Sequence, residues 1–109
     1  MITHIVLFQP KAGVTPAQKQ DLADAVQLAC TQAASVRRFE IARVIDAGAG
    51  YSKQFGEKTY EYVAVIEFDD RQGLAEYLNH PAHERLAKLF WEACEATRII
   101  DAETMTSVG

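Results

Sequence analysis

At 109 residues the chain has room for one hydrophobic core, so we expect a single domain over residues 1–109. Its 49% hydrophobic and 24% charged residues are typical of a globular protein and exclude a disordered one. The net charge of −4 makes nucleic acid and anionic membranes unfavourable partners, because both are negatively charged. The longest apolar runs are too short to cross a bilayer and no signal peptide is recognisable, so we expect a cytoplasmic protein.

The first half of the chain predicts a strand, a long helix and a second strand. Residues 2–9 alternate two largely apolar sets, which indicates a strand that is covered on both faces. Thr15-Pro16-Ala17-Gln18 is typical of a helix start, because it offers a capping threonine, a first-turn proline and a glutamine that can close a capping box. We therefore expect a helix over residues 15–34, followed by a strand over residues 38–47.

The second half predicts a further strand, two helices and a last strand. The expected elements are a glycine-rich loop over residues 48–56, a strand over 59–68, a helix from Asp69 to about Leu78, a helix from Pro81 to about Cys94, and a strand over 97–106. Pro81 separates the two helices, because it cannot donate a backbone hydrogen bond and restricts the residue before it.

Several residues are interpreted as structural. Cys30 and Cys94 fall on apolar helix positions, and neither has another cysteine or a histidine at metal-ligand spacing, so both are expected to be reduced core thiols. Asp101 is interpreted as a capping or strand-end residue. Phe90 and Trp91 are interpreted as core or interface residues.

The order βαββαβ favours an α+β fold with a four-stranded antiparallel sheet and helices on one face, the ferredoxin-like arrangement. The helices can cover only one face, yet the first and third strands are apolar on both. The side chains that we assign to the uncovered face are Val6, Phe8, Tyr62, Ile66 and Phe68. The simplest cover is the same face of another copy, so we expect a homodimer whose two sheets enclose an α/β barrel with a possible pocket inside.

The segment from Tyr77 to His83 carries the densest chemical pattern, with two of the three histidines of the chain. His83 falls in the first turn of a predicted helix, where the positive helix end disfavours imidazolium, so a neutral ring could accept a proton. The hydroxyl of Tyr77 could polarise a substrate carbonyl. The third histidine, His4, shares a strand face with Val6 and Phe8, the face that is expected to line the pocket. Together these residues suit proton abstraction next to a carbonyl.

Each of these residues also has a structural interpretation. Taken alone, His83 is typical of an exposed or capping histidine, and His80 before Pro81 is typical of a turn residue that caps a helix. Tyr77 is typical of a core aromatic, and His4 of a buried structural histidine. No carboxylate or thiol stands at a spacing that would confirm a zinc site, and there is no phosphate-binding loop or dinucleotide fingerprint, so no metal or cofactor is expected.

Three segments together resemble the stress-responsive dimeric α/β-barrel (Dabb) family: residues 3–8, residues 77–83 and the Phe90-Trp91 pair before a last strand. The resemblance covers nearly the whole chain in order and length. It implies a ferredoxin-like fold and a homodimer whose two sheets form a barrel.

The resemblance also implies roles for individual residues. In the family's olivetolic acid cyclase type, which closes a ring by aldol condensation without cofactor or metal, the roles of base and substrate-holding tyrosine would fall on His83 and Tyr77. His4 would line the same pocket. The alanines at positions 25, 29 and 33 depart from the bulkier cyclase, so the polyketide substrate is not carried over.

The sequence therefore predicts a protein that binds a small carbonyl-containing molecule, with His83 and Tyr77 as catalytic residues of cofactor-free enolisation, cyclisation or decarboxylation. The expected substrate-binding residues are His4, Val6, Phe8, Tyr62, Ile66 and His80. Two alternatives stay open: a non-catalytic stress-response or binding protein, and a cofactor-independent monooxygenase, since related dimeric barrels oxidise electron-rich phenols.

Overall fold

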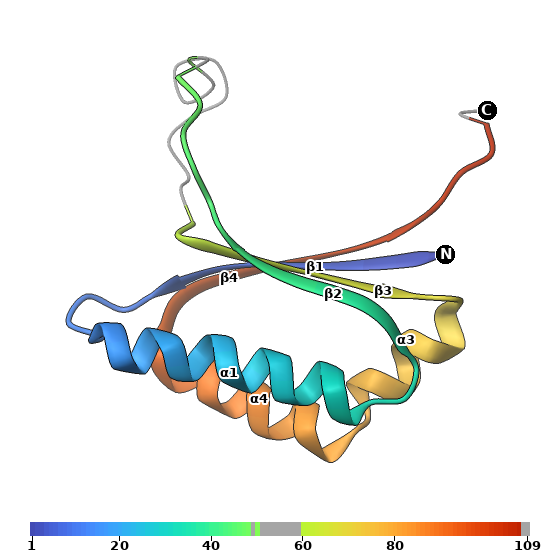
Figure 1. Cartoon of the computed structure of the whole chain (residues 1–109), viewed down its shortest axis with the longest axis horizontal. Coiled ribbons are helices and arrows are strands. Elements are labelled where there is room, and N and C mark those ends of the chain that lie inside the picture. Colours follow the sequence, from blue (N-terminus) through green and yellow to red (C-terminus); the bar gives the residue numbers. More distant parts are fainter. Residues whose placement is uncertain (49, 51–59, 108–109) are drawn as a thin grey trace.

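The computed structural model describes residues 1–48, 50 and 60–107. Its elements are β1 (Ile2–Pro10), α1 (Pro16–Gln32), β2 (Val36–Arg43), β3 (Tyr62–Phe68), α3 (Arg71–Leu78), α4 (Pro81–Ala93) and β4 (Cys94–Glu103). The sheet forms one layer and the helices form a second layer against one of its faces, with α1 and α4 side by side (Figure 1). Most of the loop expected over residues 48–56, and the first residue of the strand expected from residue 59, lie outside the described residues.

The four strands form an antiparallel sheet in the order β2-β3-β1-β4. The central strand β1 places His4 opposite Ile66 of β3 on one side and opposite Asp101 of β4 on the other. The ferredoxin-like α+β prediction is confirmed. This order matters for function because it brings the first and the last strand of the chain together.

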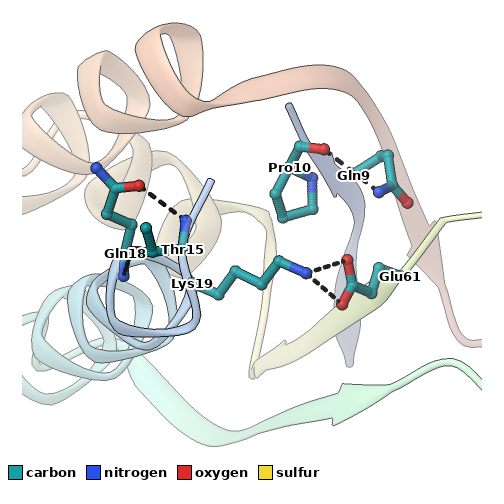
Figure 2. Close-up of polar contacts among 6 residues, drawn as sticks. All are labelled: Gln9, Pro10, Thr15, Gln18, Lys19 and Glu61. Carbon is teal, nitrogen blue, oxygen red and sulfur yellow. Dashed lines mark hydrogen bonds and ion pairs between the residues drawn. The ribbon is translucent and has the colours of Figure 1, made fainter. Parts of the chain in front are cut away.

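The helix start at α1 has the predicted capping box. The backbone N–H of Gln18 donates to Thr15 Oγ1 at 3.2 Å, and the backbone N–H of Thr15 donates to Gln18 Oε1 at 2.9 Å (Figure 2). One turn further, Lys19 Nζ donates to both carboxylate oxygens of Glu61 at 3.0 and 2.9 Å (Figure 2). This ion pair ties the start of α1 to the residue before β3, and it lowers the pKa of the Glu61 carboxyl.

The ends of the predicted strands differ from the observed ones. β2 begins at Val36 and ends at Arg43, whereas the strand was predicted over residues 38–47. The observed strand therefore ends four residues before the predicted end. β4 begins at Cys94, three residues before the predicted start, because Cys94 is both the C-cap of α4 and the first residue of the strand. Because the helix runs directly into the strand, there are no turn residues between them that could mark this boundary in the sequence.

The predicted assignment of the two sheet faces is wrong. The buried side chains of β1 and β3 at even positions, among them Phe8, Ile66 and Phe68, lie on the face that the helices cover. Val6 and Tyr62 also pack against this core. Both residue sets of β1 and β3 are apolar, so alternation alone did not indicate which set faces the helices.

The opposite surface, which we call the outer face, carries a compact group of apolar side chains. The strand register places Ile5 next to Val65 on β3 and next to Ile100 on β4, and places Leu7 next to Val63. The outer face is defined here by these five residues. They are partly exposed in the single chain, with Ile100 at 42%.

The structural interpretation of the cysteines is confirmed: Cys30 and Cys94 are free thiols and both are buried. Phe90 is a core residue as expected. Trp91 is 86% exposed, so it is not part of the core. Among the described residues, no helix is both long enough and apolar enough to span a membrane.

Candidate functional site

A cavity of about 620 Å³ lies between α4 and the sheet. It lies within one chain, so the expectation of a pocket between the sheets of two copies does not describe it. Its walls come mainly from β1, β4 and α4, with one or two residues each from α1, β3 and α3. The residues that line it are His4, Val6, Lys11, Val26, Ala64, Ile66, Tyr77, His83, Leu86, Ala87, Phe90, Trp91, Cys94, Glu95, Ala96, Thr97 and Ile99.

Tyr77 reaches the cavity from the last turn of α3. It is 1% exposed, and its ring packs on Phe68 with the centroids 5.4 Å apart. Burial raises the pKa of its hydroxyl above the ordinary value of 10.0, and the neighbouring Cys30 raises it further. Burial likewise raises the pKa of the Cys30 thiol to about 11. At neutral pH the tyrosine is therefore a hydrogen-bond donor, and the thiol is not a nucleophile.

His83 reaches the cavity from the first turn of α4. The turn that separates α3 from α4 is closed by His80, whose ring Nδ1 accepts a hydrogen bond from the backbone N–H of Ala82 at 3.0 Å. Pro81 occupies the first helical position, where its missing N–H is not needed. His83 then follows at the third helical position, half-buried and turned toward the ring of Tyr77.

The surroundings of His83 favour the neutral form of its ring. Burial lowers its pKa below the ordinary value of 6.5, and the electrostatic effect of the neighbouring His4 lowers the pKa further. A hydrogen bond with the backbone of Leu78 opposes both effects. The lowered pKa of His83 agrees with the neutral ring that the sequence predicted. Its main cause is burial, whereas the prediction attributed it to the positive end of the helix.

His4 completes the polar end of the cavity from β1. It is 2% exposed, and its ring meets that of Tyr77 edge to face with the centroids 6.0 Å apart. Its Nδ1 lies 2.5 Å from Oδ1 of Asp101 on the neighbouring strand β4. Tyr77 thus contacts both histidines, since the centroids of Tyr77 and His83 are 4.9 Å apart.

The arrangement combines a proton donor and a proton acceptor in an apolar enclosure. A protonated tyrosine can donate a hydrogen bond to a carbonyl oxygen, and a neutral histidine can accept a proton from a neighbouring carbon. The remaining walls are mainly aliphatic and aromatic side chains. Hydrogen bonds are stronger in such surroundings than in water.

The structure brings together five of the eight residues expected at the site. His4, Val6, Ile66, Tyr77 and His83 all line the cavity.

The other three expected residues lie elsewhere. Phe8 packs between Tyr62 and Phe90 in the core and, with Tyr62, borders a separate cavity near the start of α1. His80 is the N-cap of α4, which agrees with its interpretation as a turn residue that caps a helix. It does not line the main cavity.

Two residues were missed as functional candidates, one that contacts His4 and one that lines the cavity. Asp101 was interpreted as a capping or strand-end residue, although β4 places it directly opposite His4. Trp91 was interpreted as a core or interface residue, but it lines the cavity while remaining largely exposed. The sequence spacing of 97 residues between His4 and Asp101 gives no local pattern that could reveal their contact. Among the described residues, no group of three or more potential metal ligands comes together.

Residues 2–104 match the model of the Stress responsive A/B Barrel Domain (Dabb) family. The chain belongs to this family. A curated Dabb relative, the stress-response A/B barrel domain-containing protein HS1 of Arabidopsis thaliana, is 25% identical over 100 residues, which cover 92% of this chain and 86% of that protein. The family resemblance found in the sequence is therefore confirmed.

Solved structures of similar fold accompany this match. A crystal structure of an Arabidopsis thaliana protein has a TM-score of 0.82 at 20% identity and covers 98% of both chains. A dimeric ferredoxin-like protein of unknown function from Thermobifida fusca has a TM-score of 0.76 at 19% identity, covering 94% of this Dabb chain and 90% of its own. Hydroxynitrile lyase from Passiflora edulis has a TM-score of 0.81 at 14% identity, covering 99% and 96%. At these identities the similarity shows the fold alone.

Proposed function

We propose that this Dabb protein binds a small carbonyl-containing organic molecule in the cavity and catalyses cofactor-free proton transfer next to the carbonyl group. The observation that carries the proposal is the edge-to-face pair of Tyr77 and His83 at one end of an apolar cavity. The pKa of the tyrosine is raised and that of the histidine is lowered, so at neutral pH one holds its proton and the other has a free lone pair.

The reaction begins with the substrate carbonyl next to the Tyr77 hydroxyl, which donates a hydrogen bond to the oxygen. One ring nitrogen of His83 is engaged by the backbone of Leu78, which leaves the other nitrogen to take a proton from the carbon beside the carbonyl. The electron pair of the broken C–H bond forms an enolate, whose oxygen the tyrosine stabilises. The enolate then takes back a proton or attacks a second carbonyl, which gives exchange, isomerisation or ring closure.

The resemblance to the olivetolic acid cyclase type supports the last of these outcomes, because it implies the same roles for His83 and Tyr77. We do not extend it to the polyketide substrate. The hydroxynitrile lyase of similar fold supports catalysis as the function, since it is an enzyme built on this fold.

We also propose that the chain forms a homodimer through the outer face. The support is the compact apolar group of Ile5, Leu7, Val63, Val65 and Ile100, which no helix of the described chain covers. Burying such a group is favourable, and several proteins of similar fold are described as dimeric. In this dimer the two sheets face each other, and each chain keeps its own cavity on the helix side of its sheet. The cytoplasm stays the expected location, and the net charge of −4 still disfavours nucleic acid.

The test is deuterium exchange of the hydrogens beside the carbonyl of benzylacetone in D₂O, followed by proton NMR. The wild type should exchange them faster than buffer, and His83→Ala should lower the protein-catalysed rate by about 100-fold, as expected when a general base is lost. Glu84→Gln, one residue further along the same helix and exposed, is the matched control and should keep the rate.

Three results would contradict the proposal. Exchange by the wild type no faster than buffer would favour the non-catalytic alternative. An unchanged rate in His83→Ala would remove the proposed base. Oxygen consumption with a phenolic probe, measured with an oxygen electrode in place of proton exchange, would favour the monooxygenase.

A further inference from the structure

The cavity follows one side of helix α4 from its first turn to its end. The α4 residues that line it recur at spacings of three and four, which keeps their side chains on one face of the helix. They are His83, Leu86, Ala87, Phe90 and Trp91, with the C-cap residue Cys94 after them. At about 1.5 Å per residue, His83 and Cys94 lie about 16 Å apart along the axis. The cavity therefore has a second end, far from the ring of Tyr77.

This second end lies where β4 departs from regular pairing with β1. Ala96 pairs with Gln9, and the next pair of the register joins Cys94 to Pro10, so Glu95 is an extra residue on β4. Such a β-bulge breaks the strict alternation of side chains between the two faces of a sheet. Consecutive residues of β4, from Cys94 to Thr97, can therefore all line the cavity.

A lysine occupies this end from the loop after β1. The backbone N–H of Lys11 donates to the carbonyl oxygen of Ala93 at 2.8 Å, which fixes the loop against the end of α4. The Lys11 side chain lines the cavity. Burial raises the pKa of the Cys94 thiol, and the charge of Lys11 opposes that rise. The charge of Lys11 therefore acts on the buried wall of the cavity. We call Lys11, Trp91, Cys94 and Glu95 the distal end.

The two ends of the cavity differ in the chemistry that they offer. Apart from the histidines, Lys11 and Glu95 are the charged side chains that line the cavity, and of these two Lys11 is the one whose charge acts on the Cys94 thiol. Within the ranges that the structure describes, Lys11 forms no ion pair. An ammonium group has three hydrogens to donate, and a carboxylate is a strong acceptor for them. The wall between the ends is apolar, with Leu86 and Phe90 on α4.

We propose that Lys11 is a specificity-determining residue, and that the substrate is a keto acid in which an extended apolar chain separates the carbonyl group from a carboxylate. This inference rests on the proposed function, because it leaves the carbonyl group at Tyr77 and His83. The carboxylate accepts hydrogen bonds from the Lys11 ammonium, and the chain lies along the apolar side of α4. Lys11 then contributes to binding and takes no part in proton abstraction.

The binding test uses two probes of equal chain length that differ in one group. 9-Oxodecanoate carries a methyl ketone and a carboxylate at its two ends, and 2-decanone lacks the carboxylate. Dissociation constants are measured at neutral pH from the emission of Trp91. Lys11→Met should raise the dissociation constant of 9-oxodecanoate by about tenfold, as expected when a charge-assisted hydrogen bond is lost, and should change that of 2-decanone by less than about twofold.

Three further variants isolate the charge. Lys88→Met makes the same charge change at an exposed position of α4 that does not line the cavity, so it should change neither constant. Lys11→Arg keeps the charge and should retain the affinity for 9-oxodecanoate. Glu95→Gln removes the repulsive carboxylate of the distal end and should strengthen binding of the acid alone. Equal losses for both probes in Lys11→Met would overturn the inference, because they indicate a general structural role, and so would an unchanged affinity for the acid.

A kinetic measurement tests where the carbonyl group lies when the carboxylate is bound. In deuterium exchange of 9-oxodecanoate, Lys11→Met should raise KM and leave kcat near the wild-type value. Levulinate carries the same two groups too close together to reach both ends, so Lys11→Met should not change its exchange. A loss of kcat without a change in KM would overturn the inference.

The inference and the proposed function can fail separately. A wild type that exchanges benzylacetone, with Lys11→Met binding 9-oxodecanoate as tightly as the wild type, would overturn the inference alone. A wild type that binds 9-oxodecanoate in a Lys11-dependent way and exchanges none of the probes would overturn the proposed catalysis and support the carboxylate site.

Discussion

The rings of Tyr77 and His83 meet edge to face, with centroids 4.9 Å apart and planes inclined by 65°. The contact joins the end of α3 to the start of α4 across the turn that His80 and Pro81 form. Two helices that are adjacent in the sequence thus deliver a donor and an acceptor to the same end of the cavity.

Replacing Tyr77 by phenylalanine removes the donor and keeps the ring. We expect benzylacetone exchange to slow by about 100-fold, because the enolate oxygen loses its hydrogen bond. The melting temperature should stay close to that of the wild type, because the ring keeps its packing on Phe68 and His4. Exchange at the wild-type rate in this variant would show that the hydroxyl takes no part.

The lowered pKa of His83 predicts the pH dependence of the reaction. The base acts when it is neutral, so the exchange rate should rise with pH and level off, with a midpoint below 6.5. The profile is measured with benzylacetone in buffers of constant ionic strength. A midpoint above 6.5 would contradict the assignment of His83 as the base.

The same pKa also predicts a change in stability. The unfolded chain has the ordinary histidine pKa of 6.5 and the folded chain a lower one, so between these two values the unfolded state binds more protons. The free energy of unfolding should therefore decrease as pH falls from 6.5 toward the folded-state pKa. Urea denaturation at several pH values measures this slope, and His83→Gln should reduce it. An unchanged slope in that variant would assign the effect to other groups.

His80→Ala should separate helix capping from catalysis. Loss of the cap bond to the Ala82 N–H should lower the free energy of unfolding by about 1 kcal/mol. Benzylacetone exchange by the folded protein should persist, since His80 does not line the cavity. His80→Asn, which can still cap the helix, is the control and should recover most of the stability. Loss of exchange in a folded His80→Asn protein would argue for a direct role in the site.

A charge on the outer face should disrupt the proposed homodimer. Leu7→Glu places a carboxylate on the central strand β1 within that face, so we expect monomeric protein in size-exclusion chromatography with light scattering. Leu28→Glu, at an exposed position of α1, is the matched control and should remain dimeric. A dimer that survives Leu7→Glu would show that the chains associate through another surface.

Trp91 provides a direct measure of ligand binding. It is the single tryptophan of the chain and lines the cavity while 86% exposed, so an occupant of the cavity should change its surroundings. We expect tryptophan emission to change in a saturable way as benzylacetone is added, with the same midpoint as chemical-shift changes of His83. Shifts at His83 without any change in emission would place the ligand at the start of α4, away from Trp91.

Much of the local structure could be predicted because the residues that determine it are close in the sequence. Thr15 and Gln18 cap α1 as predicted, and the break between α3 and α4 falls at the predicted proline. His83 and Tyr77 were recognised as site candidates because they share this short segment, and the structure brings both to the cavity.

The errors concern contacts between distant parts of the chain. Phe8, Ile66 and Phe68 were assigned to the wrong face, since both faces of their strands are apolar and either could have met the helices. Asp101 was interpreted as a capping or strand-end residue, because nothing near it in the sequence indicates that His4 is its neighbour.

The sequence by itself determined the order of strands and helices, the positions of the helix starts and the family, because each depends on side chains within a few residues of one another or on the pattern of the whole chain. Only the tertiary structure decided which sheet face the helices cover, where the cavity lies and which carboxylate pairs with the buried histidine. These depend on how β1 pairs with β4, and strand register is set by packing across the sheet rather than by local sequence.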